Sequence, residues 1–392
     1  MEFKKIITLL AIIVSCTVYA QLQLSEKSQV SILTIGPGYV LNDAFGHSAI
    51  RVKDPVYKFD IVFDYGRYDF ESEGFYLKFV QGQLDYEVGQ SEFDDFFNQY
   101  QYQQRSVKEQ VLNLNSEQKT AFYLLLKENI KPDNKTYPYD FFYNNCATKI
   151  KEGIETTLDN PIVYYPSESF EQLSFRNLIR SDLNQNSWGS FGIDIALGSK
   201  IDQIATVEEH LFLPKYLYQL LENARIKTTD APLVSETKYL NPSDTATYNS
   251  VLNSPLFVLS ILALILLVIT YNDYKNNTRT QWLDLGLFAA TGFIGVFLLL
   301  LWFATDHTAT AYNYNLLWAC ALNILFMPSL LKTRLNNRGI SYIKFLLILL
   351  SLMGLHWLTG VQSFAIGLIP LLLGICIRYL FLIHHFKAAN RG

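Results

Sequence analysis

The sequence predicts an exported α+β domain followed by a bundle of five membrane-spanning helices. The first observation behind this prediction is an uneven distribution of charge. Residues 255–392 carry nine Lys and Arg, three Asp and no Glu, a net charge of +6, whereas residues 1–254 carry a net charge of −10. Charged residues make up only 17% of the chain, against about 25% in a typical soluble domain. The other two observations are an apolar segment at the N-terminus and five more after Pro255.

This composition excludes several classes of protein. A purely soluble enzyme would not contain a C-terminal part so nearly free of charge, and 15% aromatic residues are too many for a disordered chain. The acidic N-terminal part would repel phosphate groups, so nucleic acid is not an expected partner. We therefore expect a folded acidic domain joined to a membrane-embedded one.

The first twenty residues are typical of a secretory signal peptide. Lys4 and Lys5 supply positive charge, residues 6–14 form a short apolar core, and Val18-Tyr19-Ala20 offers a small-x-small cleavage site. A second interpretation stays open, in which Ile13-Val14-Ser15-Cys16 is a lipobox and Cys16 is lipidated. In either case the following domain is exported. The predicted organisation is a signal peptide over 1–20, an α+β domain over 21–230, a linker over 231–254 and a transmembrane domain over 255–392.

The exported domain shows both strand-like and helical patterns. A helix over 116–130 is indicated by Asn115 as its cap, by Gln118 at the third position and by apolar residues at helical spacing. A second helix begins near Asn145, with four apolar side chains on one face: Ala147, Ile150, Ile154 and Leu158. Strands are predicted over 30–35, 48–52, 59–65, 86–88 and 106–114.

The five apolar stretches after Pro255 are each long enough to cross a bilayer, which takes about 20 residues in helical form. Lys and Arg occur in the first and third connections and in the tail, while the second and fourth connections contain neither. Because positive residues stay on the cytoplasmic side, the N-terminal domain and loops 304–315 and 359–363 are predicted to lie outside. The stretches lie near 255–271, 283–303, 314–331, 341–358 and 364–386.

Cys146 is the single cysteine of the exported domain, so a disulfide within that domain is excluded. It follows Asn144 and Asn145, two good capping residues, in the first turn of the predicted helix. Unpaired amides and the helix dipole stabilise a thiolate there and lower a pKa that is normally about 8.5. Two interpretations stay open: a nucleophile, or a buried and inert thiol.

A thiol nucleophile needs a base, and the exported domain has two histidines, His47 and His210. His47 follows a glycine and opens a strand, which favours a base with room for a substrate. His210 follows two glutamates and is predicted to be a structural residue at the surface. Asp64 or Asp60, on the neighbouring strand, would orient His47. No second Cys or His lies at zinc-ligand spacing, and we expect no metal and no cofactor.

One polar segment lies outside this domain, in the loop 304–315. Asp306 and His307 follow directly on an apolar stretch, on the same side of the membrane as Cys146. The loop is either a solvated connection with interfacial tyrosines or an edge that binds a lipid head group or a substrate.

Four sequence motifs follow one another along the chain, three in the exported domain and the fourth in the loop 304–315. With FGHSAIRV around His47, FDYG after Asp60, YNNCATKI around Cys146 and TDHTATAYNYN from Thr305, the chain resembles the Lnb-type family, the lipoprotein N-acyltransferases of Bacteroidetes. The resemblance covers nearly the whole mature chain. It implies a circularly permuted papain-like (NlpC-type) thiol domain on the periplasmic side of the inner membrane.

The resemblance also implies roles for individual residues. Cys146 would be the nucleophile and His47 its base, with Asp64 as third member at a position where the resemblance leads us to expect Asn. The Cys146 backbone amide and side chains of the preceding Tyr143, Asn144 and Asn145 would bind the substrate or its oxyanion. Asp306 and His307 would add to substrate binding.

Three functions follow as hypotheses. The first is a membrane acyltransferase that moves a fatty acyl chain from a phospholipid, through a cysteine thioester, to the N-terminal amine of a diacylated lipoprotein. The second is a membrane-anchored cysteine peptidase or amidase acting on cell-wall peptides. The third is a scaffold whose lone thiol is buried. The first gives the apolar stretches a role, because both of its substrates are lipids.

Overall fold

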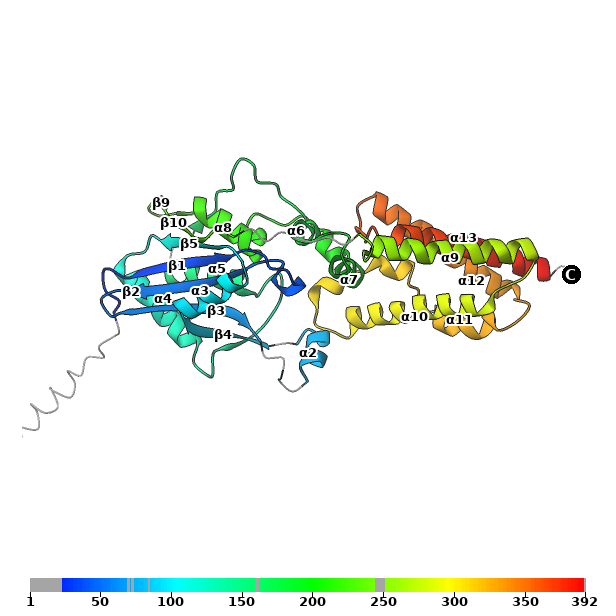
Figure 1. Cartoon of the computed structure of the whole chain (residues 1–392), viewed down its shortest axis with the longest axis horizontal. Helices are drawn as coiled ribbons and strands as arrows, with labels where there is room; N and C mark the ends of the chain where they lie inside the picture. Colours follow the sequence, from blue (N-terminus) through cyan, green and yellow to red (C-terminus); the bar gives the residue numbers. More distant parts are fainter. Residues whose placement is uncertain are drawn as a thin grey trace, which may run out of the picture.

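The computed structural model describes residues 23–68, 71, 74–83, 85–158, 162–243 and 251–390. The predicted signal peptide and Cys16 lie outside the described residues. Figure 1 shows two parts, an N-terminal α+β domain and a C-terminal bundle of long helices.

The N-terminal domain is built on a seven-stranded antiparallel sheet with the order β10-β5-β1-β2-β3-β4-β6. Strands stand at all five predicted places, and β4 is longer than predicted because its polar residues alternate at the sheet surface. The strands are β1 (Gln29–Ile35), β2 (His47–Asp54), β3 (Phe59–Arg67), β4 (Asp85–Glu92), β5 (Val107–Leu112), β6 (Thr136–Pro138) and β10 (Val234–Asn241).

The sheet is buried on both faces, which explains the near-continuous apolar runs of its central strands. On one face, side chains such as Val30 and Ile50 pack against α4, α5 and α8. On the other, Leu33 and Val62 pack against α3. Asn115 and Gln118 form the expected capping box of α4. These helices are α3 (Phe93–Tyr102), α4 (Ser116–Asn129), α5 (Cys146–Leu158) and α8 (Pro214–Asn223).

The linker predicted over 231–254 is wrong in its first half. Strand β10 lies within it and pairs with β5 at the edge of the sheet. Its side chains are mostly polar because one edge strand needs few buried residues. The sheet domain therefore extends to Asn241. A small second sheet consists of β7 (Ile162–Val163), β8 (Arg225–Ile226) and β9 (Ala231–Pro232).

The prediction of five continuous spanning helices is wrong. In the described part of the chain, four helices are long and apolar enough to cross a membrane. The third predicted stretch instead contains the 3₁₀ helix η5 (Tyr314–Leu317) and the short helix α11 (Asn323–Leu330). Hydropathy was sufficient for a spanning helix, but residues 318–322 are not helical and a regular helix begins only at Asn323. The four long helices are α9 (Pro255–Asn276), α10 (Gln281–Phe303), α12 (Asn337–Leu358) and α13 (Leu368–Ala389).

This discontinuous segment nevertheless runs along the whole of α10. At one end the Thr310 hydroxyl donates to the Leu301 carbonyl at 2.8 Å, and at the other the Gln281 amide donates to the Leu330 carbonyl at 2.9 Å. Between them, Gly295 lets the backbones meet, since a Cβ there would lie 2.2 Å from the Ala319 carbonyl oxygen. Small residues allow this approach between membrane helices. The chain thus returns to the far end of the bundle without a fifth long helix.

The two domains are joined through α7 (Trp188–Ala196) and the loop that follows it (Figure 1). The Asn313 side-chain amide donates to the Ile195 carbonyl at 2.8 Å, and the Asn315 amide to the Asp194 carbonyl at 2.9 Å. Gly198 is in such close contact that a Cβ would lie 1.9 Å from the Ala311 carbonyl oxygen. The outer loop of the bundle therefore packs against segment 192–198.

A buried ion network stiffens this junction. The Arg176 guanidinium, on α6 (Phe175–Ser181), is 1% exposed and pairs with Asp194 at 2.9 Å and Asp202 at 3.0 Å. Arg180 completes the network by pairing with Asp194 at 2.8 Å, and it also donates to the Phe364 carbonyl of the bundle. Asp202, in the 3₁₀ helix η2 (Ser199–Asp202), accepts from the Ser363 amide at 3.1 Å. The same charges thus hold α6, α7, η2 and the second outer loop together.

Candidate active site

Cys146 is the first residue of α5, as predicted. The preceding Asn145 is buried and caps the helix, its side-chain oxygen accepting from the amides of Ala147 at 2.9 Å and Thr148 at 3.0 Å. The Cys146 amide has no acceptor within the helix, since it belongs to the first turn. Gly66, with φ +96°, lies beside the thiol, and a Cβ there would lie 3.9 Å from the Cys146 Cβ.

His47 is the first residue of β2 and stands at the end of the sheet, opposite Ile35. The glycine before it is required: Gly46 has φ +77°, and a Cβ there would lie 2.6 Å from the Ile35 carbonyl oxygen. His47 and Cys146 line the same cleft, and each shifts the pKa of the other. The structure therefore brings together the two residues predicted as nucleophile and base.

Asp64 lies near the end of β3, at the same end of the sheet as His47. Its Oδ2 is 3.8 Å from the His47 Nε2, and its Oδ1 accepts from the Arg67 Nε at 2.9 Å. Arg67 fits because residue 89 is glycine, where a Cβ would lie 2.3 Å from the guanidinium. The alternative, Asp60, is paired with Arg51 at 2.6 Å, so Asp64 is the carboxylate that faces His47.

The three groups favour an ionised pair. Burial raises the pKa of Cys146, but the charge and hydrogen bond of His47 and the amides of Ser48 and Ala147 outweigh it, so the thiol pKa lies below its ordinary value. Burial lowers the pKa of His47, but neighbouring Tyr100 and Cys146 and a hydrogen bond to Asp64 raise it well above the usual value. The lowered pKa of Cys146 and the raised pKa of His47 both favour a thiolate beside an imidazolium.

The carboxyl group of Asp64 stays ionised in this arrangement. Burial raises its pKa, but hydrogen bonds from His47 and Arg67 reverse the effect and place the pKa below its ordinary value. A carboxylate beside an imidazolium stabilises the charged ring. Asp64 thus places a negative charge beside His47.

An Asp64→Asn substitution is expected to lower the pKa of His47 by about one unit, because the imidazolium loses an opposite charge. NMR titration of the full chain labelled with [¹³C]histidine measures this midpoint, with the His47 signal assigned by its loss in His47→Asn. Asp60→Asn is the matched control, since Asp60 pairs with Arg51 and should leave the midpoint unchanged. An equal midpoint in Asp64→Asn and wild type would show that the carboxylate does not act on His47.

The side-chain amides of Asn144 and Asn145, which were predicted to bind an oxyanion, donate to backbone carbonyl groups instead. The Asn145 Nδ2 donates to the carbonyls of Phe141 and Phe212, both at 2.8 Å, and the Asn144 Nδ2 donates to the Pro138 carbonyl at 2.5 Å. The structure does not direct either amide to the sulfur. Their roles are to cap α5 and to close the loop before it.

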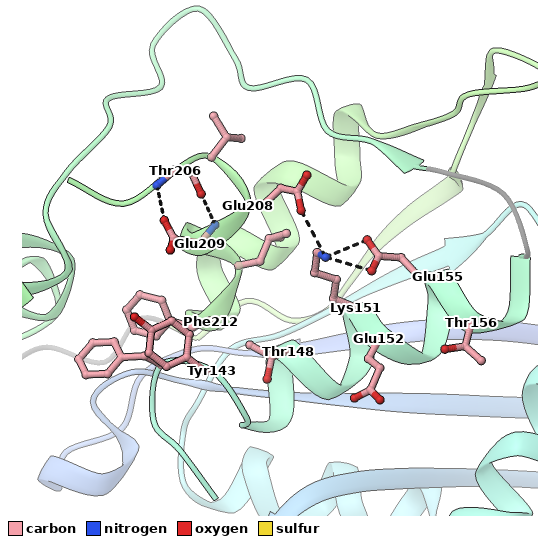
Figure 2. A pocket seen from close by; sticks show the side chains of 13 residues that line it. Tyr143, Thr148, Lys151, Glu152, Glu155, Thr156, Thr206, Glu208, Glu209 and Phe212 are labelled. Atoms are coloured by element: carbon pink, nitrogen blue, oxygen red, sulfur yellow. Dashed lines mark hydrogen bonds and ion pairs between the residues drawn. The ribbon is translucent and has the colours of Figure 1, made fainter. Parts of the chain in front are cut away.

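Tyr143 also points away from the thiol. It lines a separate groove of about 770 Å³ on the outer side of α5, as Figure 2 shows. The charges of that groove are largely paired within it, since Lys151 contacts Glu155 at 2.9 Å and Glu208 at 3.4 Å. Cys146 does not line this groove.

The surface position predicted for His210 is wrong, although its structural role is supported. The residue is fully buried, its Nε2 accepts from the Leu173 amide at 3.2 Å, and its Nδ1 lies 2.7 Å from the Thr206 carbonyl oxygen. Burial is the main cause that lowers its pKa. The two glutamates before it suggested exposure, but they occupy the outer side of the 3₁₀ helix η3 (Glu208–Phe212) while the imidazole turns inward.

Cys146 opens into a cleft of about 560 Å³ whose wall includes aromatic residues that sequence reasoning did not select. Tyr86 and Tyr139 stack at 4.0 Å between ring centroids. Burial, then the charge of Cys146, raises the pKa of Tyr139 well above the ordinary value, so its hydroxyl stays protonated. The aromatic residues just before Cys146 were the available signal, but the sequence does not tell which of these rings faces the thiol.

Asp306 and His307 lie on a neighbouring cavity and not on the wall of the Cys146 cleft. They bond to the C-terminal end of α2 (Phe75–Gln81). The Asp306 amide donates to the Gln81 carbonyl at 2.8 Å, its carboxylate accepts from the Gln83 amide at 2.8 Å, and the His307 Nε2 lies 3.0 Å from the Phe79 carbonyl oxygen. The two residues therefore join the bundle to the sheet domain.

Two family models match the chain. The Lnb N-terminal periplasmic domain matches residues 17–174, which include His47, Asp64 and Cys146, and the Lnb transmembrane domain matches residues 247–389. Comparisons with curated proteins and with solved structures gave no match. Family membership points to an enzyme of lipoprotein biogenesis. The chain therefore belongs to the Lnb family, as a multi-pass membrane protein whose N-terminal domain is periplasmic.

Proposed function

We propose that the protein is a thiol-dependent N-acyltransferase. It moves a fatty acyl chain from a phospholipid to Cys146, and from the resulting thioester to the N-terminal amine of a diacylglyceryl-cysteine lipoprotein. The observation that carries this proposal is the ionised Cys146–His47 pair, held in a cleft of the domain that rests on the membrane bundle. Both substrates are anchored in lipid, so a site beside the bilayer can receive each of them.

In the first step the Cys146 thiolate attacks the ester carbonyl of the phospholipid. A C–S bond forms and the carbonyl becomes an oxyanion. When the oxyanion collapses, the ester C–O bond breaks and the lysophospholipid alkoxide takes the proton of the His47 imidazolium. The products are a lysophospholipid, a Cys146 thioester and neutral His47.

In this proposal two donors hold the oxyanion. One is the Cys146 amide in the first turn of α5, and the other is the protonated Tyr139 hydroxyl on the cleft wall. A single preorganised donor of this kind typically contributes about 3 kcal/mol to the transition state. Tyr139 replaces the asparagine side chains in this role, because their amides are already bonded to carbonyls.

In the second step the α-amine of the lipoprotein attacks the thioester. An α-amine has a pKa of about 7.7–8.0, so a useful fraction is neutral at physiological pH. His47 accepts the proton that the nitrogen loses, the C–S bond breaks, and the thiolate–imidazolium pair is restored. The thioester reacts readily with amines, and exclusion of water from the cleft limits its hydrolysis.

The order of the catalytic elements supports a circularly permuted papain-like thiol fold for this domain. His47 and Asp64 lie on strands that precede the helix of Cys146 in the chain. The N-terminus of α5 nevertheless lies beside the ends of β2 and β3. The chemistry depends on this spatial arrangement and not on the order of the residues in the chain.

The proposal predicts the outcome of a nucleophile substitution. In cells depleted of their own N-acyltransferase, the wild-type chain should add a third acyl chain to lipoprotein N-termini, as measured by mass spectrometry. Cys146→Ser should reduce this at least about 1,000-fold, as is usual when a nucleophile is removed. Cys376→Ser, the same change in helix α13 of the bundle, is the matched control and should retain activity.

Three results would contradict the proposal in different ways. If the wild type adds no third chain, N-acylation is not its reaction. If Cys146→Ser equals the wild type, the thiol is not the nucleophile. Capture of a cell-wall peptide on Cys146, with lipoproteins left diacylated, would favour the peptidase or amidase instead.

A further inference from the structure

A chamber of about 380 Å³ lies between the sheet domain and the membrane bundle. The sheet domain contributes aromatic side chains such as Phe45 and Phe141, α7 and the residue after it contribute Ile193 and Leu197, and the outer loop of the bundle contributes Ala309. Most of the lining is apolar, as in cavities that bind apolar ligands. None of the residues that carry out the proposed chemistry, other than Tyr139, lines this chamber.

The chamber adjoins the Cys146 cleft. Five residues line both cavities: Asn42, Phe45, Tyr86, Tyr139 and Phe141. The stacked rings of Tyr86 and Tyr139 therefore stand between the chamber and the cleft of Cys146. Tyr139, proposed above as an oxyanion donor, stands at the boundary between the two cavities.

The rim of the chamber lies at the level of the membrane surface. Helix α10 ends at Phe303, and three residues later Asp306 bonds to the end of α2, so α2 lies just beyond the end of a membrane helix (Figure 1). Apolar side chains on α2 are exposed, among them Leu77 at 63% and Phe79 at 54%. Such exposure suits contact with lipid.

The opposite side of the rim has the same character. Tyr39, Val40 and Leu41 are consecutive exposed side chains just before the 3₁₀ helix η1 (Leu41–Asp43) and at its start. Leu41 lies against α7, where a Cβ on Gly189 would be 2.9 Å from its Cδ1. Two segments with exposed apolar side chains, 39–41 and 77–80, thus lie beside the chamber, and each contributes one lining residue, Leu41 and Phe79.

The two carboxylates of the chamber, Asp306 and Asp140, are already bonded to other groups of the protein. Asp306 bonds to Gln81 and Gln83, while Asp140 accepts from the amides of Phe142 and Tyr143 and from the Thr308 hydroxyl. The polar lining therefore closes the walls and leaves the apolar surface to the ligand. A peptide would bring backbone groups into this space that need partners of their own.

We infer that this chamber binds one fatty acyl chain of the phospholipid donor, which enters from the outer leaflet between segments 39–41 and 77–80 and brings its ester carbonyl to Cys146. The inference rests on the proposed function for the identity of the donor. It assigns to Asp306 and His307 the task of holding the rim closed on α2, and to Ile193, Leu197 and Ala309 the contact with the chain.

Filling the chamber tests the inference. Ile193→Trp places bulk inside it, whereas Ile204→Trp makes the same change at a 65% exposed position outside both cavities. The purified full chain is mixed with vesicles of dipalmitoyl phosphatidylethanolamine or with soluble dihexanoyl phosphatidylcholine, and the Cys146 thioester is measured by intact mass. We expect Ile193→Trp to lose at least about tenfold in rate with the long-chain donor, while keeping its rate with the short-chain donor.

The control should match wild type with both donors. Equal rates of wild type and Ile193→Trp on the long-chain donor would overturn the inference while leaving the proposed function intact. Absence of any thioester in the wild type with either donor would instead contradict the proposed function.

A binding experiment that needs no catalysis separates the two further. The Cys146→Ser full chain is irradiated with a phosphatidylethanolamine that carries a diazirine near the end of one acyl chain, and the labelled peptides are mapped. Labels on Phe141, Ile193, Leu197 or Ala309 are expected, and Ile193→Trp should reduce them. Labels confined to the outer surfaces of α9, α12 and α13 would refute the chamber as the acyl site, whatever the reaction proves to be.

Discussion

Alkylation of Cys146 by iodoacetamide at pH 7 is expected to slow several-fold in a His47→Ala variant. An ordinary thiol with a pKa near 8.5 is only about 3% ionised at pH 7, whereas the wild-type thiolate is stabilised by the charge and hydrogen bond of His47. Burial remains in the variant and raises the pKa of Cys146. The thiolate fraction therefore falls at least to that of a free cysteine.

The pH profile provides the control for this experiment. The wild-type rate should stay constant as pH falls below 8.5 and decline only at the lowered pKa of Cys146. The variant rate should rise with pH and approach the wild-type rate once the thiol is ionised in both. A difference that persists at alkaline pH would indicate altered access to the sulfur. Parallel profiles at all pH values would contradict the ion pair.

For turnover, the same pair predicts a broad bell-shaped profile. Activity falls at low pH as the Cys146 thiolate is protonated, and at high pH as the His47 imidazolium, which must protonate the leaving alkoxide, loses its proton. Because the pKa of Cys146 is lowered and that of His47 is raised, the active window includes neutral pH.

Substitution of Arg176 by Met is expected to destabilise the protein by about 3–5 kcal/mol, the usual cost of removing one partner from a buried ion pair. Asp194 would keep Arg180, but Asp202, whose side chain is 8% exposed, would lose its only guanidinium partner in the described part of the chain. Thermal unfolding of the full chain in detergent measures the loss. Proteolysis at the junction should increase in parallel, because α6, α7 and η2 share this cation.

Two further variants make the result specific. Arg225→Met removes an exposed pair with Asp230 at 3.4 Å and should cost no more than about 1 kcal/mol. Adding Asp202→Asn to Arg176→Met should recover part of the stability, since it removes the unpaired charge. If Arg176→Met and Arg225→Met have equal effects, the network does not stiffen the junction.

Features set by local rules could be predicted from the sequence. Helix α4 begins at its capping box, and Cys146 begins α5, because both signals involve only residues within one turn. His47 could be selected because it is one of the two histidines of the exported domain and follows a glycine. The histidine that was rejected, His210, is indeed structural, yet its burial depends on contacts with distant residues.

Features set by distant partners could not be predicted. Asn145 was expected to face the substrate, but one of its amide hydrogens is taken by the carbonyl of Phe212, 67 residues along the chain. Tyr139 could not be distinguished from its aromatic neighbours until the cleft was formed. The third apolar stretch had enough hydropathy for a spanning helix, but hydropathy does not report that Gly292 and Gly295 leave a place for irregular backbone on α10.

The discontinuous segment 304–331 constrains how the membrane domain is assembled. A buried polar side chain in lipid needs a partner, and the partners of Asn323 lie on other helices: its amide donates to the Thr291 hydroxyl at 2.8 Å, and the Tyr342 hydroxyl donates to its carbonyl oxygen at 2.7 Å. We therefore expect α10 and residues 304–331 to enter the bilayer together, because Gly295 brings their backbones into contact. A mutation at Gly295 would then appear first as failed insertion and only secondarily as lost activity.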